Sequence, residues 1–203
     1  MEIVHVKGIV IAENQLREND KMLTVFSDKH GKISVSAKGA KKSGSKFVAC
    51  TQIFCYSDME LYCGKSHIYT LKDAELLESF YDLRTDIDKL MVASDIIRLT
   101  SKVIQEELAD EEVLRLLLNT LYYLSKGEKL SPELLFCIYR VRLVYLQGYF
   151  PLIRYKHSGT KLAIDHICNS AMEKLFKFSV SEDVLHELGN ICEKIVKEML
   201  EGI

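Results

Sequence analysis

The spacing of apolar residues changes along the chain, and this change constrains the fold more than any other feature. Over roughly the first 72 residues, apolar and polar residues alternate, which is typical of half-buried β-strands. From about residue 80, apolar residues recur every three to four positions, which indicates amphipathic helices. A chain of 203 residues can bury a core without disulfide or metal support. We therefore predict an α+β multidomain protein, with a β-domain over 1–80 and an α-helical bundle over 81–203.

The N-terminal part contains five candidate strands separated by turn residues. They are expected at 3–11, 22–26, 33–37, 47–63 and 67–71. We expect a bulge or tight bend at Gly8, a positive φ at Gly31 and a turn over 64–66. Five short strands predict a small barrel, for which the OB-fold is the commonest solution and an SH3-like barrel is the alternative. The link to the helices is expected over 72–82.

Helix-start and helix-stop residues divide the C-terminal part. The signals are Thr85 with Asp88, Asp110, Gly127, and the run Ser131-Pro132-Glu133. The last run combines an N-cap, a proline at the first helical position and an acid in the first turn. These signals predict three helices, of which the third ends near Gly148. Weaker patterns predict further helices over about 165–178 and 182–200.

The charges are unevenly distributed. The formal net charge of −2 argues against a strongly basic nucleic-acid binder. Residues 1–72 contain eleven basic and seven acidic residues, whereas residues 73–203 contain sixteen basic and twenty-two acidic residues. Segment 29–46 contains six lysines and no acid. A lysine-rich loop supplies charges for phosphates without reading bases, although a solvated face explains such a run equally well.

Aromatic residues also lie along the predicted barrel strands. They are Phe26, Phe47, Phe54, Tyr56, Tyr62 and Tyr69. Exposed aromatic side chains on such a barrel stack on unpaired bases. Most aromatic side chains in small domains fill the core, so this is the commoner role for each of them.

The sequence contains no strong catalytic or metal-binding signature. P-loop, G-x-G-x-x-G, H-E-x-x-H and G-x-S-x-G motifs are absent from the sequence. His166 and Cys168 are two potential ligands, but no second pair stands at zinc-site spacing. No apolar run approaches the roughly 20 residues that span a bilayer, and the N-terminus lacks signal-peptide features. We expect a cytoplasmic protein that is not an enzyme and has no cofactor, metal or membrane contact.

Several motifs, taken in order, resemble the RecO family of bacterial recombination mediators. RENDKMLTVFS at 17–27, GK at 31–32 and AKGAKKS at 37–43 are similar to the family's N-terminal domain, except that Arg17 replaces its glycine. YTLKDAEL at 69–76 resembles the family's segment that connects the barrel to the helices. GYFP at 148–151 resembles the family's motif at the end of the third helix. The resemblance spans roughly residues 1–151. It implies an OB-fold DNA-binding domain followed by a helical domain.

The resemblance also implies a function and its residues. It implies a mediator that binds single- and double-stranded DNA, anneals complementary strands and assists RecA loading with RecR and the single-stranded-DNA-binding protein. The implied DNA contacts are Lys38, Lys41, Lys42 and Lys46, with Lys21 and Lys32 as further candidates. Arg140 and Arg142 are implied contacts for the acidic C-terminal tail of the single-stranded-DNA-binding protein, although their spacing alone favours snorkelling from a packed face. Many family members have two C-x-x-C pairs after G-Y-x-P. Residues 152–162 contain no cysteine here, so we expect no zinc.

Two other functions compete with a DNA-binding mediator. One is a protein-only adaptor, in which the barrel binds a partner peptide and the lysines are only solvated. The other is a small-molecule or nucleotide-modifying enzyme, for which the sequence offers no set of catalytic residues. The salt dependence of DNA binding separates the mediator from the adaptor.

Overall fold

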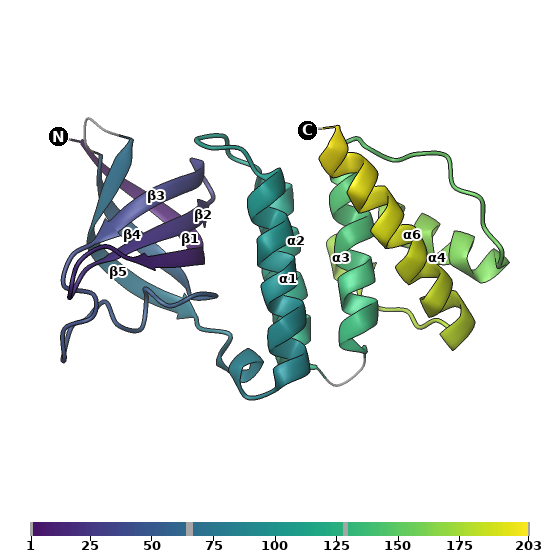
Figure 1. Cartoon of the computed structure of the whole chain (residues 1–203), viewed down its shortest axis with the longest axis horizontal. Helices are drawn as coiled ribbons and strands as arrows, with labels where there is room; N and C mark the ends of the chain where they lie inside the picture. Colours follow the sequence, from purple (N-terminus) through teal and green to yellow (C-terminus); the bar gives the residue numbers. More distant parts are fainter. Residues whose placement is uncertain (1, 64–66, 128–129, 203) are drawn as a thin grey trace. The chain divides into compact units, whose positions relative to one another are not determined.

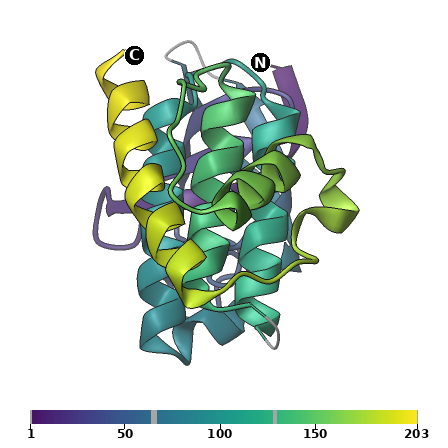
Figure 2. The same ribbon diagram turned by 90° about the vertical axis from the view of Figure 1, so that its right-hand side faces the viewer.

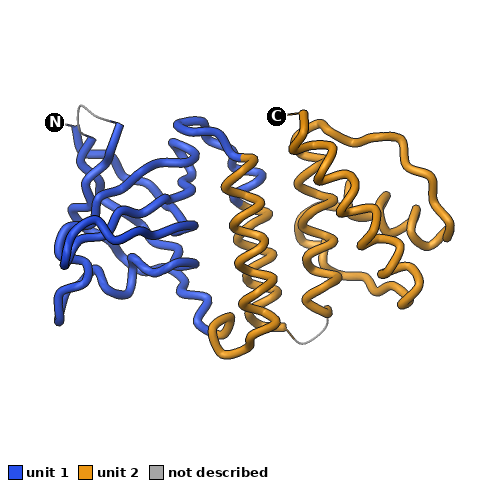
Figure 3. The backbone as a smooth tube through the Cα atoms, viewed as in Figure 1, with its two compact units in different colours: residues 1–81, 104–114 blue, residues 82–103, 115–203 orange. Residues whose placement is uncertain are grey.

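The computed structural model describes residues 2–63, 67–127 and 130–202, so the turn predicted over 64–66 lies outside the described residues (Figure 1). The chain divides into two compact units (Figure 3). Unit 1 contains residues 1–81 and 104–114, and unit 2 contains residues 82–103 and 115–203. The segment 104–114 therefore belongs with the β-strands, although it follows a long helix in the sequence.

Unit 1 is built on a closed five-stranded barrel. Its strands are β1 (Glu2–Gln15), β2 (Lys21–Ser27), β3 (Gly31–Ala37), β4 (Tyr56–Cys63) and β5 (Ile68–Glu78). They are ordered β1-β2-β3-β5-β4, and β4 pairs with β1 to close the barrel. Only the β3–β5 pair is parallel among these neighbours. This is an OB-fold arrangement, so the predicted OB-type barrel is confirmed over the SH3-like alternative.

The barrel core follows from the alternation seen in the sequence. Successive side chains of a strand point to opposite faces, so every second residue enters the barrel. The buried set is Val6, Val10, Leu23, Val25, Ile33, Val35, Met59, Leu61, Tyr69 and Leu71. Gly31 takes a φ of +58° in the β2–β3 turn, as predicted.

The bulge predicted at Gly8 lies elsewhere. The register of β1 against β2 shifts between Val10 and Ala12, so the bulge surrounds Ile11. Gly8 instead permits close packing, because a Cβ atom there would lie only 2.5 Å from Val25 Cγ1.

The prediction of one strand over 47–63 is wrong in its first half. Residues 47–55 form successive turns, and β4 begins at Tyr56. Thr51 donates its backbone N–H and its hydroxyl to the Phe47 carbonyl, at 3.1 and 2.8 Å, and Phe54 has a φ of +72°. Local hydrogen bonds of this kind compete with a strand ladder. The link expected over 72–82 is also wrong in part, because β5 continues to Glu78.

The helices are α1 (Ile87–Val103), α2 (Glu111–Lys126), α3 (Pro132–Leu146), α4 (Ser158–Asn169), α5 (Met172–Leu175) and α6 (Glu182–Glu201), preceded by the 3₁₀ turn η1 (Tyr81–Arg84). In unit 2, α3 packs against α1, α4 and α6, and Figure 2 shows α6 alongside α3. Because helices pack against α3 on several sides, most of its circumference consists of buried apolar side chains.

The helix caps confirm two predictions and correct a third. The Ser131 hydroxyl accepts the Leu134 N–H at 3.2 Å, and the Asp110 carboxylate accepts the Val113 N–H at 3.0 Å. At α1 the cap is Asp86 rather than Thr85, because the Asp86 carboxylate accepts the N–H groups of residues 88 and 89. The helix predicted over 165–178 is misplaced. It begins at Ser158, ends at Asn169 and is followed by the separate short helix α5.

Candidate nucleic-acid interface

Four of the predicted DNA-contacting lysines lie in one segment after β3, residues 38–46, here named the basic loop. Lys38, Lys41, Lys42 and Lys46 are all exposed. The backbone turns twice, with the Lys42 N–H bonded to the Gly39 carbonyl at 3.1 Å and the Ser45 N–H bonded to the Lys42 carbonyl at 3.0 Å. Within the part of the chain that the structure describes, the ammonium groups of Lys38 and Lys42 form no ion pair. Their charges are therefore accessible to phosphates.

The tip of the β1–β2 hairpin, residues 16–20, holds the basic loop. The Asp20 carboxylate accepts the Gly39 N–H at 2.7 Å, and the Asn19 carbonyl accepts the Lys41 N–H at 3.0 Å. The Lys41 ammonium donates to Gln15 Oε1 at 3.1 Å. Gly39 has a φ of +67°, a conformation that glycine adopts without strain. Two motifs that are separate in the sequence, END at 18–20 and KGAKK at 38–42, therefore lie against each other.

Lys46 lies at the end of the basic loop and is paired. Its ammonium is 2.6 Å from Asp73 Oδ1 and 5.2 Å from the centre of the Phe47 ring. The hydrogen bond from Lys46, followed by that from the Ala74 N–H, lowers the pKa of Asp73. Both side chains of the pair are more than half exposed, so the pair adds little stability and a phosphate can compete for the lysine.

The other two lysine candidates lie in different surroundings. Lys21 is only 15% exposed, and its ammonium contacts Glu13 Oε2 at 2.6 Å and the Thr51 carbonyl at 3.1 Å. Lys32 lies at the opposite end of β3 from the basic loop, roughly 20 Å along the strand at about 3.3 Å per residue. Its backbone N–H donates to the Gln105 carbonyl at 3.3 Å, which attaches segment 104–114 to the barrel. Lys38, Lys41, Lys42 and Lys46 therefore share one exposed loop. Lys21 lies beside the start of that loop, opposite Ala37, but is mostly buried, and Lys32 lies at the far end of β3.

The predicted aromatic residues divide into two groups. Phe26, Phe54 and Tyr69 are at most 7% exposed and belong to the core. Phe47, Tyr56 and Tyr62 are half-buried. Phe47 lies beside Lys46, and the Lys72 ammonium lies 5.2 Å from the centre of the Tyr62 ring. Only the half-buried group has ring surface available for stacking on bases.

Acidic and basic residues occupy different regions of unit 1. A shallow hollow of about 280 Å³ on β1, β4 and β5 is lined by His5, Asp58, Glu60, Asp73 and Glu75. Residues 73–81 and 104–114 add eight acidic and no basic residues to the seven acidic and eleven basic residues of 1–72. Unit 1 as a whole therefore has more acidic than basic residues, and the excess of basic residues found over 1–72 is densest in segment 29–46.

Arg140 and Arg142, the predicted peptide contacts, point to different sides of α3. Two positions along an α-helix correspond to a rotation of about 200°. Arg142 donates to the carbonyls of Ile167 and Cys168 in the last turn of α4, so its charge stabilises a helix C-terminus. The Arg140 guanidinium lies 3.6 Å from the centre of the Phe136 ring and lines a groove between α3 and α6.

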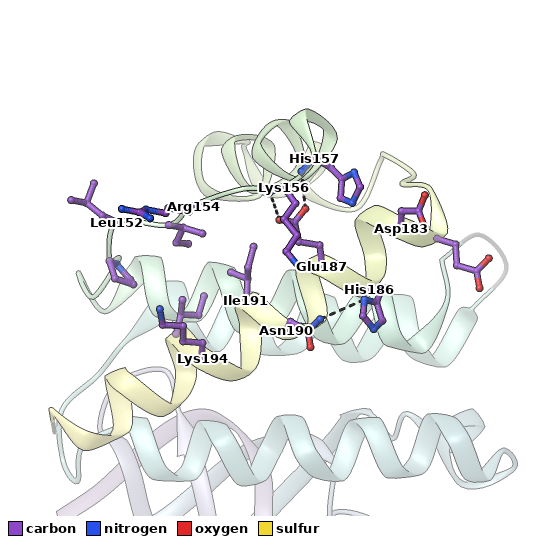
Figure 4. Close-up of a pocket in the computed structure, with 14 residues that line it drawn as sticks. Leu152, Arg154, Lys156, His157, Asp183, His186, Glu187, Asn190, Ile191 and Lys194 are labelled. Atoms are coloured by element: carbon purple, nitrogen blue, oxygen red, sulfur yellow. Dashed lines mark hydrogen bonds between the residues drawn. The ribbon is translucent and has the colours of Figure 1, made fainter.

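A larger pocket in unit 2, of about 750 Å³, lies between residues 151–157 and α6 (Figure 4). Its apolar lining comes from Leu152, Ile153, Ile191 and Ile195. Its charged lining has three basic residues, Arg154, Lys156 and Lys194, and three acidic residues, Glu182, Asp183 and Glu187. Figure 4 shows Leu152, Arg154 and Lys194 at one end, and Asp183 and His157 at the other. Leu152 is fully exposed, which is unusual for a large apolar side chain. The pocket shares Glu182, His186 and Asn190 with the groove that contains Arg140.

Glu187 fixes one wall of this pocket, and no motif in the sequence had pointed to it. Its side chain is 8% exposed and accepts the backbone N–H groups of Lys156 and His157 and the Thr160 hydroxyl. Burial by itself would raise the pKa of Glu187, but these hydrogen bonds hold that pKa below its usual value. His157 at the N-cap of α4 makes no side-chain capping bond, and Glu187 on α6 instead holds the two residues that lead into this helix by their backbone N–H groups. A buried acid in an amphipathic helix is the only sequence signal that could have identified it.

The pair of potential metal ligands, His166 and Cys168, does not converge on a site. His166 contacts the Lys174 carbonyl and the Ser170 hydroxyl, each at 3.1 Å, while burial raises the pKa of Cys168 to about 11. Among the described residues, no group of three or more His, Cys, Asp or Glu side chains is arranged to hold a metal ion. Within the same residues, no helix is both long and apolar enough to cross a membrane.

Comparison with known families supplies the identification. Residues 1–80 match the family model described as "Recombination protein O N terminal", and residues 84–162 match "Recombination protein O C terminal". The chain belongs to the RecO family. The resemblance inferred from the motifs is therefore confirmed, and the two matches follow the change from strands to helices.

Curated relatives named "DNA repair protein RecO" extend the match beyond residue 162. The protein of Acetivibrio thermocellus is 35% identical over 99% of this chain and 93% of the relative. The protein of Clostridium perfringens is 33% identical over 98% of this chain and 74% of the relative. The protein of Clostridium novyi is 34% identical over 73% of this chain and 57% of the relative. The first alignment has 236 positions against a chain of 203 residues, so that relative has at least 33 residues without a counterpart here.

Proposed function

We propose that this RecO family member is a DNA-binding mediator of recombinational repair. It binds single- and double-stranded DNA through the basic loop, anneals complementary strands, and assists RecA loading together with RecR and the single-stranded-DNA-binding protein. In this proposal residues 1–80 are the DNA-binding domain, residues 81–203 form the helical domain, and the protein acts in the cytoplasm at the nucleoid. The observation that carries it is a basic loop whose backbone is hydrogen-bonded to the β1–β2 hairpin while Lys38, Lys41 and Lys42 are exposed.

Strand annealing by such a surface needs no fuel molecule. Lysine ammonium groups neutralise phosphates and release counterions, which reduces the repulsion between two strands. Base pairing then supplies the free energy. Phosphate contacts of this kind do not read sequence, which suits a protein that acts on any damaged region.

The test is a titration of a labelled single-stranded oligonucleotide, followed by fluorescence anisotropy, against a variant with Lys38, Lys41 and Lys42 changed to alanine. Each phosphate contact to a single strand contributes about 0.7 to log K at roughly 0.1 M salt, so removing three weakens binding about 100-fold. The matched control changes the exposed lysines 161, 174 and 177 of unit 2 to alanine, and we expect it to bind like the parent. If the basic-loop variant also binds like the parent, the phosphate contacts lie elsewhere and the assignment to the basic loop is wrong. A parent that shows no salt-dependent DNA binding favours the protein-only adaptor.

We propose the pocket beside α6 and the Arg140 groove as the site for the acidic tail of the single-stranded-DNA-binding protein. The pocket also holds carboxylates, but Arg154 and Lys194 lie together with Leu152 at the end away from Asp183, and this end favours a peptide that has both apolar and acidic residues. Arg142 stays a prediction for this role, since its guanidinium is bound to α4 carbonyls. A charge-reversing pair, Arg154→Glu with Lys194→Glu, should weaken binding of the tail peptide in calorimetry and leave binding of single-stranded DNA unchanged. Equal peptide affinity for this variant and the parent would refute the assignment.

A further inference from the structure

We propose that Asp20 is a positioning residue that holds the basic loop in its DNA-binding conformation. A carboxylate next to lysines that contact phosphates would then increase DNA affinity rather than reduce it. The inference rests on the proposed function, because it concerns the same loop.

The first support is the geometry of the contact. Asp20 Oδ1 accepts the Gly39 N–H at 2.7 Å, and Gly39 lies between Lys38 and the Lys41–Lys42 pair. The backbone of Asp20 is itself fixed, because its carbonyl accepts the Leu16 N–H at 3.0 Å and its N–H donates to the Arg17 carbonyl at 3.3 Å. The carboxylate therefore extends from a hydrogen-bonded turn and holds the basic loop at Gly39, its residue with positive φ.

The second support is that the rest of the segment is held from the same hairpin. Asn19 contributes its carbonyl to the Lys41 N–H, and Lys21 bonds the Thr51 carbonyl further along the chain. Lys21 is also held by Glu13 and is 15% exposed, so its position suits an anchor better than a phosphate contact. Residues 19–21 thus contact the segment between β3 and β4 at three points.

The charge of Asp20 and its role in holding the basic loop predict opposite effects on DNA affinity when the carboxylate is removed. If only charge mattered, removing a carboxylate beside phosphate-binding lysines would strengthen binding. If position matters, removing the acceptor frees the Gly39 N–H, and the lysines no longer present their charges together. Ordering the loop again upon binding then costs conformational entropy.

Two substitutions at this position separate the effects. Asp20→Asn removes the charge and keeps a side-chain oxygen that accepts the Gly39 N–H, whereas Asp20→Ala removes both. The control is Glu18→Gln, which removes the charge of an exposed neighbour. Each variant is titrated with single-stranded DNA at several salt concentrations, and thermal unfolding by circular dichroism checks that it is folded.

We expect Asp20→Asn and Glu18→Gln to bind at least as tightly as the parent. Asp20→Ala should bind about fivefold more weakly at roughly 0.1 M salt, with a slope of log K against log salt smaller by about 0.7, as expected when one fewer phosphate is neutralised. Equal affinity and slope for Asp20→Ala and Asp20→Asn would overturn the inference while leaving the proposed function intact. If the parent itself shows no salt-dependent DNA binding, the proposed function fails, and this inference fails with it.

Discussion

Replacing Glu187 with glutamine tests how the pocket wall in unit 2 is held. The two carboxylate oxygens accept three hydrogen bonds, from two backbone N–H groups and the Thr160 hydroxyl. A glutamine side chain keeps one oxygen and turns an NH₂ group toward at least one of these donors. The substitution changes few atoms, so its effect reports on the hydrogen bonds rather than on packing.

The expected cost follows from counting these bonds. One N–H group that is left unsatisfied beside a buried side chain costs about 1–3 kcal/mol. The bonds that remain lose the assistance of the negative charge, which is worth roughly 1 kcal/mol each. We therefore expect a loss of about 3–5 kcal/mol in the free energy of unfolding. For a chain of this size that corresponds to a decrease in Tm of about 6–20 °C.

The pH dependence provides a second measurement. Hydrogen bonds hold the pKa of Glu187 below its ordinary value of 4.5 in the folded protein. A lowered folded-state pKa contributes stability that is complete above the unfolded-state pKa and is lost as pH falls through the folded-state pKa. The difference between the parent and Glu187→Gln should therefore be constant near neutral pH and decrease below about pH 4.5.

The assay is urea unfolding followed by far-ultraviolet circular dichroism, at neutral pH and at several acidic values. Glu193→Gln is the control, because it makes the same chemical change at an exposed position on α6. We expect the control to remain within about 0.5 kcal/mol of the parent. A similarly small effect for Glu187→Gln, or a difference that grows as the pH falls below 4.5, would refute the reasoning.

Two further substitutions test the fold. Ser131→Ala removes the hydroxyl that accepts the Leu134 N–H at the start of α3, so it should cost about 1 kcal/mol in urea unfolding, whereas Ser131→Asp should largely preserve stability. Gly8→Ala places a Cβ atom 2.5 Å from Val25 Cγ1 inside the barrel, so it should cost about 1–3 kcal/mol, and the added substitution Val25→Ala should recover part of that loss. A Gly8→Ala variant as stable as the parent would show that the barrel can widen at this point.

Features governed by neighbouring residues could be predicted from the sequence. The caps at Asp110 and Ser131 depend on a side chain and an N–H group three residues apart, so the local pattern was sufficient. The barrel was predictable because its alternation persists across several strands. The cap of α1 was assigned to Thr85 rather than Asp86, which is within the usual uncertainty of helix ends.

Features that depend on distant segments could not be predicted. Residues 47–55 are apolar enough for a strand, but hydrogen bonds from Thr51 to Phe47 and contacts with Lys21 form turns. The start of α4 has no side-chain cap of its own, and the residues that lead into it are held by Glu187 on the distant helix α6. Lysines could be recognised as a cluster, but the sequence did not show that Lys21 is mostly buried and paired with Glu13 whereas Lys38 and Lys42 are exposed.

The central claim is that the basic loop contacts DNA phosphates, and the salt dependence of binding tests it most directly. The slope of log K against log salt is measured for single-stranded DNA with the parent and with the variant in which Lys38, Lys41 and Lys42 are alanine. At about 0.7 per phosphate contact, the slope should be smaller by about 2 in the variant. An unchanged slope would contradict the account, because the phosphate contacts would then lie elsewhere on the molecule.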